Sequence, residues 1–216
     1  MDLTITRKQG EFIKAKEGEV LFGGAAGGGK SYGQLIDSLL FALKYPHSKQ
    51  LILRRTYPEL EKSIIRTSLE LYPRDLAVYK SQGRMWKFNN GSVIEFGNCE
   101  NEKDVYRYQS AEYDIIRFDE LTHFTEDIYI YLISRVRGTN GYPKQVKSST
   151  NPGGVGHSWV KERFIDPVPP MTVNKTVGGT RIFIPSKVDD NVFLMKNDPE
   201  YKERLKNLSE NDQKAL

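Results

Sequence analysis

The sequence has very little cysteine and no long hydrophobic run, and each absence excludes a class of protein. Cys99 is the only cysteine in 216 residues, which excludes an internal disulfide framework and favours a reducing compartment. The longest apolar stretch, residues 35–43, is interrupted by Asp37 and Ser38 and is too short to span a bilayer. The N-terminus is polar and charged, without the hydrophobic region of a signal peptide. These features predict a soluble, intracellular protein.

Charge of one sign is not in large excess either. The chain has 32 basic and 28 acidic residues, a net charge of +4, which permits a local basic patch without requiring one. Its three histidines are scattered, with no metal-ligand spacing, and no GxSxG nucleophile motif occurs. Hydrophobic residues make up 38% of the chain, which is enough to form the core of one globular domain.

What is present is an alternation of short apolar strands and helices, with no internal repeat. Strands are predicted near residues 20–22, 50–54, 86–88, 93–96, 115–118 and 145–149, and helices near 6–16, 30–44, 58–72 and 126–136. Asn90-Gly91 predicts a tight turn between two of the strands. This order predicts an α/β fold with a mostly parallel sheet, helices on both faces and an inserted β-hairpin at an edge.

A glycine-rich loop follows the first strand and matches the pattern GxxxxGK[ST] in full. It reads Gly24-Ala25-Ala26-Gly27-Gly28-Gly29-Lys30-Ser31. Glycine torsions expose N–H groups toward a phosphate, and the helix that follows adds its positive N-terminal end. Lys30 is expected to neutralise the β and γ phosphates of a nucleotide, and the Ser31 hydroxyl to bind Mg²⁺. The alternative, a plain glycine-rich connector, is disfavoured by the flanking strand and helix.

An acidic pair, Asp119-Glu120, ends the strand at 115–118. Asp119 is expected to hold Mg²⁺, and Glu120 to act as the base or to orient the attacking water. Because side chains alternate along a strand, the two carboxylates are expected on opposite sides. An ordinary acidic turn is the alternative. Arg117 does not suit a strand buried on both faces, so either its stem snorkels to solvent or that face is open to a partner.

With these motifs in place, the chain resembles the ATPase domain of the large subunit of tailed-phage terminases, the motors that package viral DNA. The resemblance covers nearly all of the chain and is carried by Thr6-Arg7-Lys8-Gln9, Gly24 to Ser31, Leu53-Arg54-Arg55, Asn90-Gly91-Ser92, Tyr106 to Tyr113, Asp119-Glu120, Ser149-Thr150-Asn151-Pro152, Asp190-Asn191 and Asp198-Pro199-Glu200-Tyr201. It implies a P-loop NTPase fold of the RecA/ASCE type, with an ATPase core at 1–186 and a small C-terminal lid or linker at 187–216.

The resemblance also implies roles for individual residues. Gln9 is similar to a glutamine whose amide reads adenine, and Ser149-Thr150-Asn151 to a coupling motif that senses the γ-phosphate. A polar helix residue and a strand-ending turn are the respective alternatives. The expected ATP-binding residues are Gln9, Gly24, Gly27, Gly28, Gly29, Lys30, Ser31, Thr150 and Asn151. Ser31 and Asp119 are expected at Mg²⁺, and Glu120, Lys30 and Arg107 in catalysis.

Arg107 enters this set because such a motor needs an arginine at the transferring phosphoryl group. Some family members keep an arginine inside the loop, whereas residues 25–27 provide none here. A finger from elsewhere is therefore expected, supplied by a neighbouring subunit. Arg107 resembles the trans-acting position of the family best, and Arg135 and Arg137 compete with it. A solvated or salt-bridged surface arginine is the alternative for each.

DNA contact is less well defined by the sequence. The densest basic group is formed by Arg54, Arg55, Lys62 and Arg66. Such a group can bind the phosphates of the DNA backbone without contacting the bases. Glutamates in the same stretch make a solvated helix face an equal explanation. The nuclease domain of the family is expected beyond Leu216, so this fragment is expected to hydrolyse ATP without cutting DNA.

The leading interpretation is a motor that uses ATP to move double-stranded DNA into a procapsid. The implied partners are the DNA, a portal protein, a small terminase subunit and further copies in a homo-oligomeric ring, in the host cytoplasm and without a membrane. A helicase-like or recombination-type DNA-dependent ATPase of the same core is the first alternative. A nucleotide switch or small-molecule kinase and a non-catalytic nucleotide-binding module are further alternatives, and Glu120 argues against the last.

Overall fold

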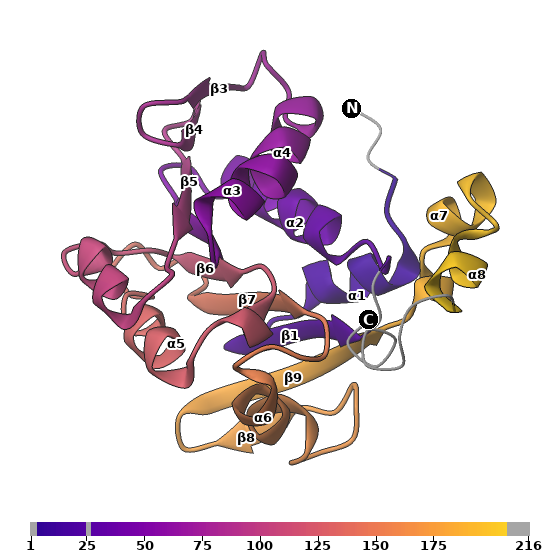
Figure 1. Ribbon diagram of the computed structural model, residues 1–216. Helices are drawn as coiled ribbons and strands as arrows, with labels where there is room; N and C mark the ends of the chain where they lie inside the picture. The colour runs from indigo at the N-terminus through magenta and orange to yellow at the C-terminus, as the bar shows by residue number, and fades with distance from the viewer. Residues whose placement is uncertain (1–3, 25–26, 207–216) are drawn as a thin grey trace.

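The computed structural model describes residues 4–24 and 27–206. Within these residues one nine-stranded sheet has the order β3-β4-β5-β2-β6-β7-β1-β9-β8 (Figure 1). The strands are β1 (Glu19–Gly24), β2 (Lys49–Arg54), β3 (Ala77–Lys80), β4 (Met85–Phe88), β5 (Val93–Asn98), β6 (Ile115–Phe118), β7 (Gln145–Thr150), β8 (Asn174–Thr176) and β9 (Gly179–Ser186).

The helices and turns of helix lie between and after these strands. They are α1 (Arg7–Lys14), α2 (Lys30–Lys44), α3 (Tyr57–Leu60), η1 (Glu61–Ile65), α4 (Arg66–Leu71), η2 (Glu102–Tyr108), η3 (Leu121–His123), α5 (Glu126–Ile133), α6 (His157–Val160), η4 (Lys161–Ile165), η5 (Val188–Asp190), α7 (Val192–Asn197) and α8 (Tyr201–Lys206). None of these helices is long and apolar enough to cross a membrane.

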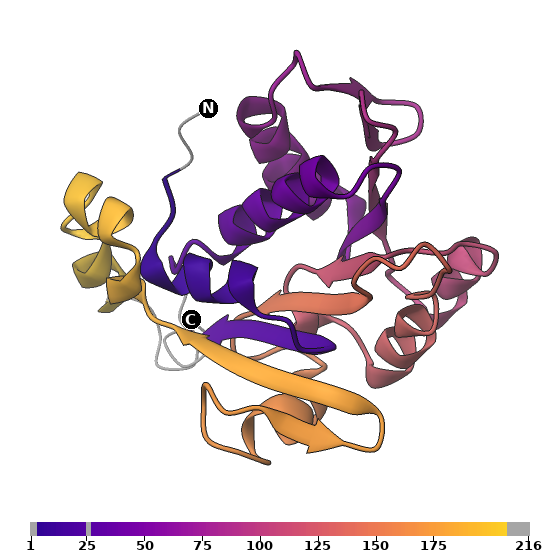
Figure 2. The same ribbon diagram turned by 180° about the vertical axis from the view of Figure 1, so that it is seen from behind.

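The sheet is mostly parallel, as predicted. Strands β5, β2, β6, β7, β1 and β9 run parallel to one another, and the antiparallel pairings lie toward the two ends of the sheet (Figures 1 and 2). The predicted turn joins β4 to β5, and Gly91 takes the positive φ of 82° that favours glycine there. The resulting β3-β4-β5 unit extends the sheet beyond β2.

Hydrophobic side chains alternate between the two faces of the sheet and build a core on each. Leu51 and Leu53 of β2 pack on one face with α5 and η4, whereas Ile52 between them packs on the other with α2, α3 and η1. A third cluster joins Phe12 of α1 to β1 and β9. Helices therefore cover both faces, which confirms the predicted fold class.

The sequence interpretation missed β9, which is the direct neighbour of β1. Ile182 and Ile184 point to one face and are buried, the period-2 signal of a strand. This strand contains Pro185, which cannot donate to a ladder. In the described residues β8 pairs with β9 only at positions 179–181, so Pro185 lies where the outer side of β9 has no ladder partner.

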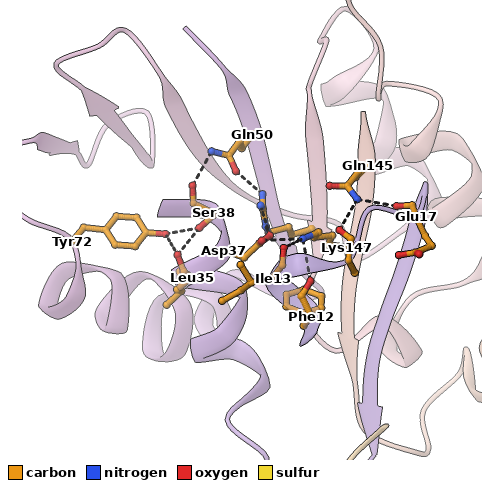
Figure 3. A network of polar contacts seen from close by, with 12 residues as sticks. Phe12, Ile13, Glu17, Leu35, Asp37, Ser38, Gln50, Tyr72, Gln145 and Lys147 are labelled. Carbon is orange, nitrogen blue, oxygen red and sulfur yellow. Dashed lines mark hydrogen bonds and ion pairs between the residues drawn. The ribbon is translucent and has the colours of Figure 1, made fainter. Parts of the chain in front are cut away.

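Both explanations for Arg117 were wrong. Its side chain is fully buried and is neutralised inside the fold, where it donates to Asp37 Oδ2 from Nε at 3.2 Å and NH2 at 2.6 Å. Lys147 Nζ donates to the other oxygen, Asp37 Oδ1, at 2.9 Å, and Gln50 accepts from Arg117 NH1. Figure 3 shows Asp37 and Lys147 facing each other between helix and sheet. We call Asp37, Arg117 and Lys147 the buried ion cluster.

Candidate nucleotide site

Three parallel strands end side by side, and each carries one of the motifs found in the sequence. β7 lies between β6 and β1, with Ser148 opposite Phe118 and Ser149 opposite Phe22. The glycine-rich loop follows β1, the acidic pair follows β6, and Asn151 follows β7. Because carboxyl ends of parallel strands meet at one edge, the fold brings these motifs together.

The glycine-rich loop has backbone torsions that few other residues adopt. Gly24, Gly27 and Gly29 have positive φ values of 135°, 76° and 69°. Gly29 is the N-cap of α2, so the loop leads directly to the N-terminal N–H groups of that helix. A Cβ at Gly29 would lie 2.7 Å from Gln9 Nε2, a second reason for glycine at this position. Ala25 and Ala26 lie outside the described residues.

Asp119 joins the loop to the end of β7 through one oxygen. Its Oδ1 accepts from Ser31 Oγ at 2.8 Å and from Ser149 Oγ at 2.7 Å, and the carboxylate is fully buried. The sequence interpretation did not assign Ser149 as a partner of Asp119, because the pairing depends on the β6–β7 register. Asn191 was likewise not assigned a contact, and its Nδ2 donates to Gly27 O at 2.6 Å.

The oxygens of Ser31 and Asp119 fit a magnesium ion. Hydroxyl and carboxylate oxygens are the hard ligands that Mg²⁺ prefers, and in nucleotide sites one or two protein groups suffice, with phosphates and waters completing the shell. In the part of the chain that the structure describes, no group of three or more His, Cys, Asp or Glu residues could hold a metal by itself.

Asn151 connects Lys30 of the loop to Glu120. Lys30 Nζ donates to Asn151 Oδ1 at 2.8 Å. On its other side, Asn151 donates to Glu120 from Nδ2 at 2.9 Å and from its backbone N at 3.1 Å. The three side chains thus form one continuous line of polar contacts along the strand ends.

Burial shifts the pKa values of Lys30 and Glu120, the two ionisable groups joined through Asn151. Burial lowers the pKa of Lys30, and the carboxylates of Glu120 and Asp119 oppose that shift. Burial raises the pKa of Glu120 above its usual value, and the neighbouring charge of Asp119 adds to the shift while Lys30 counters it. A carboxyl group with a raised pKa is better suited to accept a proton from water.

The predicted strand-like alternation of Asp119 and Glu120 is wrong. β6 ends at Phe118, and Glu120 takes a left-handed conformation with φ 58° and ψ 62°. A non-glycine residue in this region is strained and marks a constrained site. The turn directs Glu120 to Asn151, while Asp119 contacts Ser31 and Ser149.

Thr150 lies beside this line but faces the turn after Glu120. Its hydroxyl accepts from the backbone N of Thr122 at 3.2 Å and lies 3.0 Å from Thr122 Oγ1. Thr150 therefore braces the turn that holds Glu120. Its expected contact with nucleotide stays a prediction.

Gln9 lies against the loop with both ends of its amide engaged. Its Oε1 accepts from Thr6 N at 2.8 Å in a capping box, and its Nε2 donates to Gly29 O at 2.7 Å. It also lines a cavity of about 430 Å³ together with Tyr32 and Asn191. This cavity is next to the loop, because Gly29 also lines it, and adenine reading by Gln9 stays a prediction.

The three candidate finger arginines each pair with neighbours on their own part of the chain. Arg107 is exposed on η2 and pairs with Asp104 Oδ1 at 2.5 Å. Arg135 NH1 donates to Gln109 O at 2.7 Å, and Arg137 pairs with Glu112 at 3.4 Å. The structure does not bring any of them to the Asp119–Ser31 contact, and the trans-acting role of Arg107 stays a prediction.

The basic group expected at DNA is divided by the structure. Lys62 and Arg66 are exposed on η1 and α4. Arg54 instead forms an ion pair with Asp119, with 3.0 Å between NH1 and Oδ2, and Arg55 NH1 donates to His123 O. Only the first two thus remain as an exposed basic pair.

A parallel sheet that brings a glycine-rich loop, Lys-Ser and an acidic pair to one edge defines a P-loop nucleotide-binding domain. Residues 21–216 match the family model described as "Terminase large subunit, T4likevirus-type, N-terminal". The chain belongs to this family, whose members are phage DNA-packaging proteins. A search of curated proteins found no match.

Solved structures of packaging proteins share the fold. The large terminase from a thermophilic bacteriophage, in complex with ADP, has a TM-score of 0.74 at 16% identity, over 93% of this chain and 50% of that one. The ATPase domain of the Thermus phage P74-26 large terminase has a TM-score of 0.68 at 13% identity, over 98% of this chain and 92% of that one. The N-terminal domain of the DNA packaging ATPase from bacteriophage phi29 has a TM-score of 0.59 at 18% identity, over 85% of this chain and 96% of that one. This chain spans about half the length of the first of these proteins.

Proposed function

We propose that this domain hydrolyses ATP with Mg²⁺ and that hydrolysis drives double-stranded DNA into a procapsid. The proposal rests on three contacts, Ser31–Asp119, Lys30–Asn151 and Asn151–Glu120, which together link all three strand-end motifs. Complexes of the large terminase of a thermophilic phage with ADP and with ATP-γ-S support nucleotide binding by this chain.

Each side chain has a defined task in the proposed reaction. Lys30 neutralises the β and γ phosphates, and the N–H groups at the start of α2 bind their oxygens. Ser31 and Asp119 would hold Mg²⁺, which would supply positive charge beside the phosphates. Glu120 accepts the proton of the attacking water, and its raised pKa suits that transfer.

Asn151 couples the two halves of the site. A γ-phosphate that attracts Lys30 competes with Asn151 Oδ1 for its ammonium group, and Asn151 also fixes Glu120. Binding of ATP and the later release of its γ-phosphate therefore change the hydrogen-bond partners of Asn151, the residue that holds Glu120. The change passes along β7 and through Thr150 to the turn at Thr122.

The proposed assembly supplies Arg107, which a single chain does not place at its own glycine-rich loop. A neighbouring subunit in a ring supplies Arg107, and the exposed Lys62 and Arg66 contact DNA phosphates. A portal protein and a small terminase subunit complete the proposed assembly on the procapsid in the host cytoplasm. Residues 1–186 act as the ATPase core, and 187–216, which include α7 and α8, act as a lid or linker.

The assembly is tested by ATP hydrolysis as a function of protein concentration. Wild-type specific activity is expected to rise with concentration, and Arg107→Ala to lower turnover about 10³-fold, the loss typical of an arginine finger. Mixing Arg107→Ala with Glu120→Gln subunits should restore part of the activity, because the second variant keeps its arginine. Lys103→Ala, an exposed neighbour on η2, is the control. Specific activity that does not change with protein concentration and is unaffected by Arg107→Ala would contradict a trans-acting role for Arg107.

A further inference from the structure

Arg54 lies inside the nucleotide site, although the sequence grouped it with basic residues for DNA. It ends β2, the strand beside β6, and Leu53 pairs directly with Phe118. This register places the guanidinium next to Asp119, with NH1 3.0 Å from Oδ2. The side chain of Arg54 is only 17% exposed and that of Asp119 is 0% exposed, so the pair is shielded from solvent.

Arg54 is held in this position by the helix on the adjacent face. Its NH1 donates to Ser63 Oγ at 2.6 Å, and Ser63 in turn donates to Glu59 O at 2.7 Å. Arg54 Nε is buried and has no hydrogen-bond partner among the described residues. A buried, unpaired donor costs stability, so packing alone does not account for an arginine here.

The contact with Asp119 is one of charge. Asp119 Oδ1 is already fixed by Ser31 and Ser149, whereas Oδ2 has the Arg54 ion pair but no hydrogen bond in the described part of the chain. Glu120 follows directly, so two carboxylates lie beside the loop that would receive a triphosphate. Lys30 offsets one of these negative charges, and Arg54 offsets the other.

We propose that Arg54 is the arginine that this chain itself contributes to the nucleotide site. It neutralises Asp119, so that a triphosphate can approach the loop even when no metal ion is bound there. The inference rests on the proposed function. Arg54 acts through Asp119 and is in this sense a positioning residue. Without it the loop faces an uncompensated carboxylate, which repels the phosphates until Mg²⁺ binds.

The test is binding of a fluorescent ATP analogue, once in EDTA and once in saturating Mg²⁺. Arg54→Met is expected to weaken binding about tenfold or more in EDTA, as expected for one uncompensated charge a few ångströms from the phosphates. With Mg²⁺ present, binding should stay within about threefold of wild type, since the metal then neutralises the carboxylate. Arg54→Lys, which keeps the charge, should recover most of the EDTA binding. Arg74→Met, at an exposed arginine that donates to Leu69 O, is the matched control.

A second variant isolates the charge of Asp119. Adding Asp119→Asn to Arg54→Met removes the carboxylate that Arg54 neutralises, so binding in EDTA should return toward wild type. The same double variant keeps the test valid if Arg54→Met alone proves poorly folded, which thermal denaturation would reveal. Equal weakening of binding with and without Mg²⁺, or no weakening, would overturn the inference. Failure of the wild type itself to bind the analogue would instead overturn the proposed function.

Discussion

Glu120→Gln should bind ATP with nearly wild-type affinity and lose about 10³-fold in turnover. The substitution keeps the shape of the side chain and an oxygen for Asn151 Nδ2, so the line from Lys30 to residue 120 remains. What it removes is the group that accepts a proton, and general bases typically contribute about 10²- to 10⁴-fold. Burial and the Asp119 charge raise the pKa of this carboxyl group, which suits a group that accepts a proton.

Two measurements on that variant separate binding from chemistry. Titration with a fluorescent ATP analogue gives the dissociation constant, and phosphate release gives kcat. Glu126→Gln, an exposed glutamate in the first turn of α5, is the control and should leave both unchanged. Normal turnover by Glu120→Gln would remove Glu120 from catalysis and leave the strained turn without a catalytic explanation.

Asp37→Asn should destabilise the fold by about 3–5 kcal/mol, the range measured when one partner of a buried ion pair is removed. Asp37 is the carboxylate between Arg117 and Lys147 in the buried ion cluster. Both cations are almost fully buried, so its loss leaves two positive charges without a counter-ion. Burial already lowers the pKa of Lys147, and the Asp37 charge opposes that shift.

Thermal denaturation measures this effect. For a chain of this size, the melting temperature of Asp37→Asn should fall by roughly 10 °C. Asp166→Asn, which removes one partner of the exposed Lys161–Asp166 pair, should cost less than about 1 kcal/mol. Equal, small changes in both variants would contradict the role of the buried ion cluster in stability.

The sequence predicted the parts of the fold that depend on local patterns. The strand before the loop and the helix from Lys30 to Lys44 follow from an apolar run and a glycine-rich start. Strand β9 was not predicted, although Ile182 and Ile184 alternate as in a strand with one buried face. Arg117 was misinterpreted because its counter-ion is 80 residues away, on the helix after the loop.

The candidate site shows the same division. Lys30, Ser31, Asp119 and Glu120 belong to motifs whose spacing carries the chemistry, so sequence alone was enough to propose them. Arg54 was not found because its partner depends on β2 lying next to β6, and strand order cannot be derived from a local pattern. The spatial order also explains why Ser149, on β7, reaches the same carboxylate.

We propose that the site formed by Lys30, Ser31, Asp119 and Glu120 hydrolyses ATP. The most direct test is a single-turnover assay, with the purified chain at high concentration in excess over labelled ATP and with Mg²⁺. The wild type is expected to form ADP, and Lys30→Ala to slow this step at least about 10²-fold, since it removes the charge at the β and γ phosphates. Equal rates for the two proteins, or no ADP from the wild type, would contradict the account.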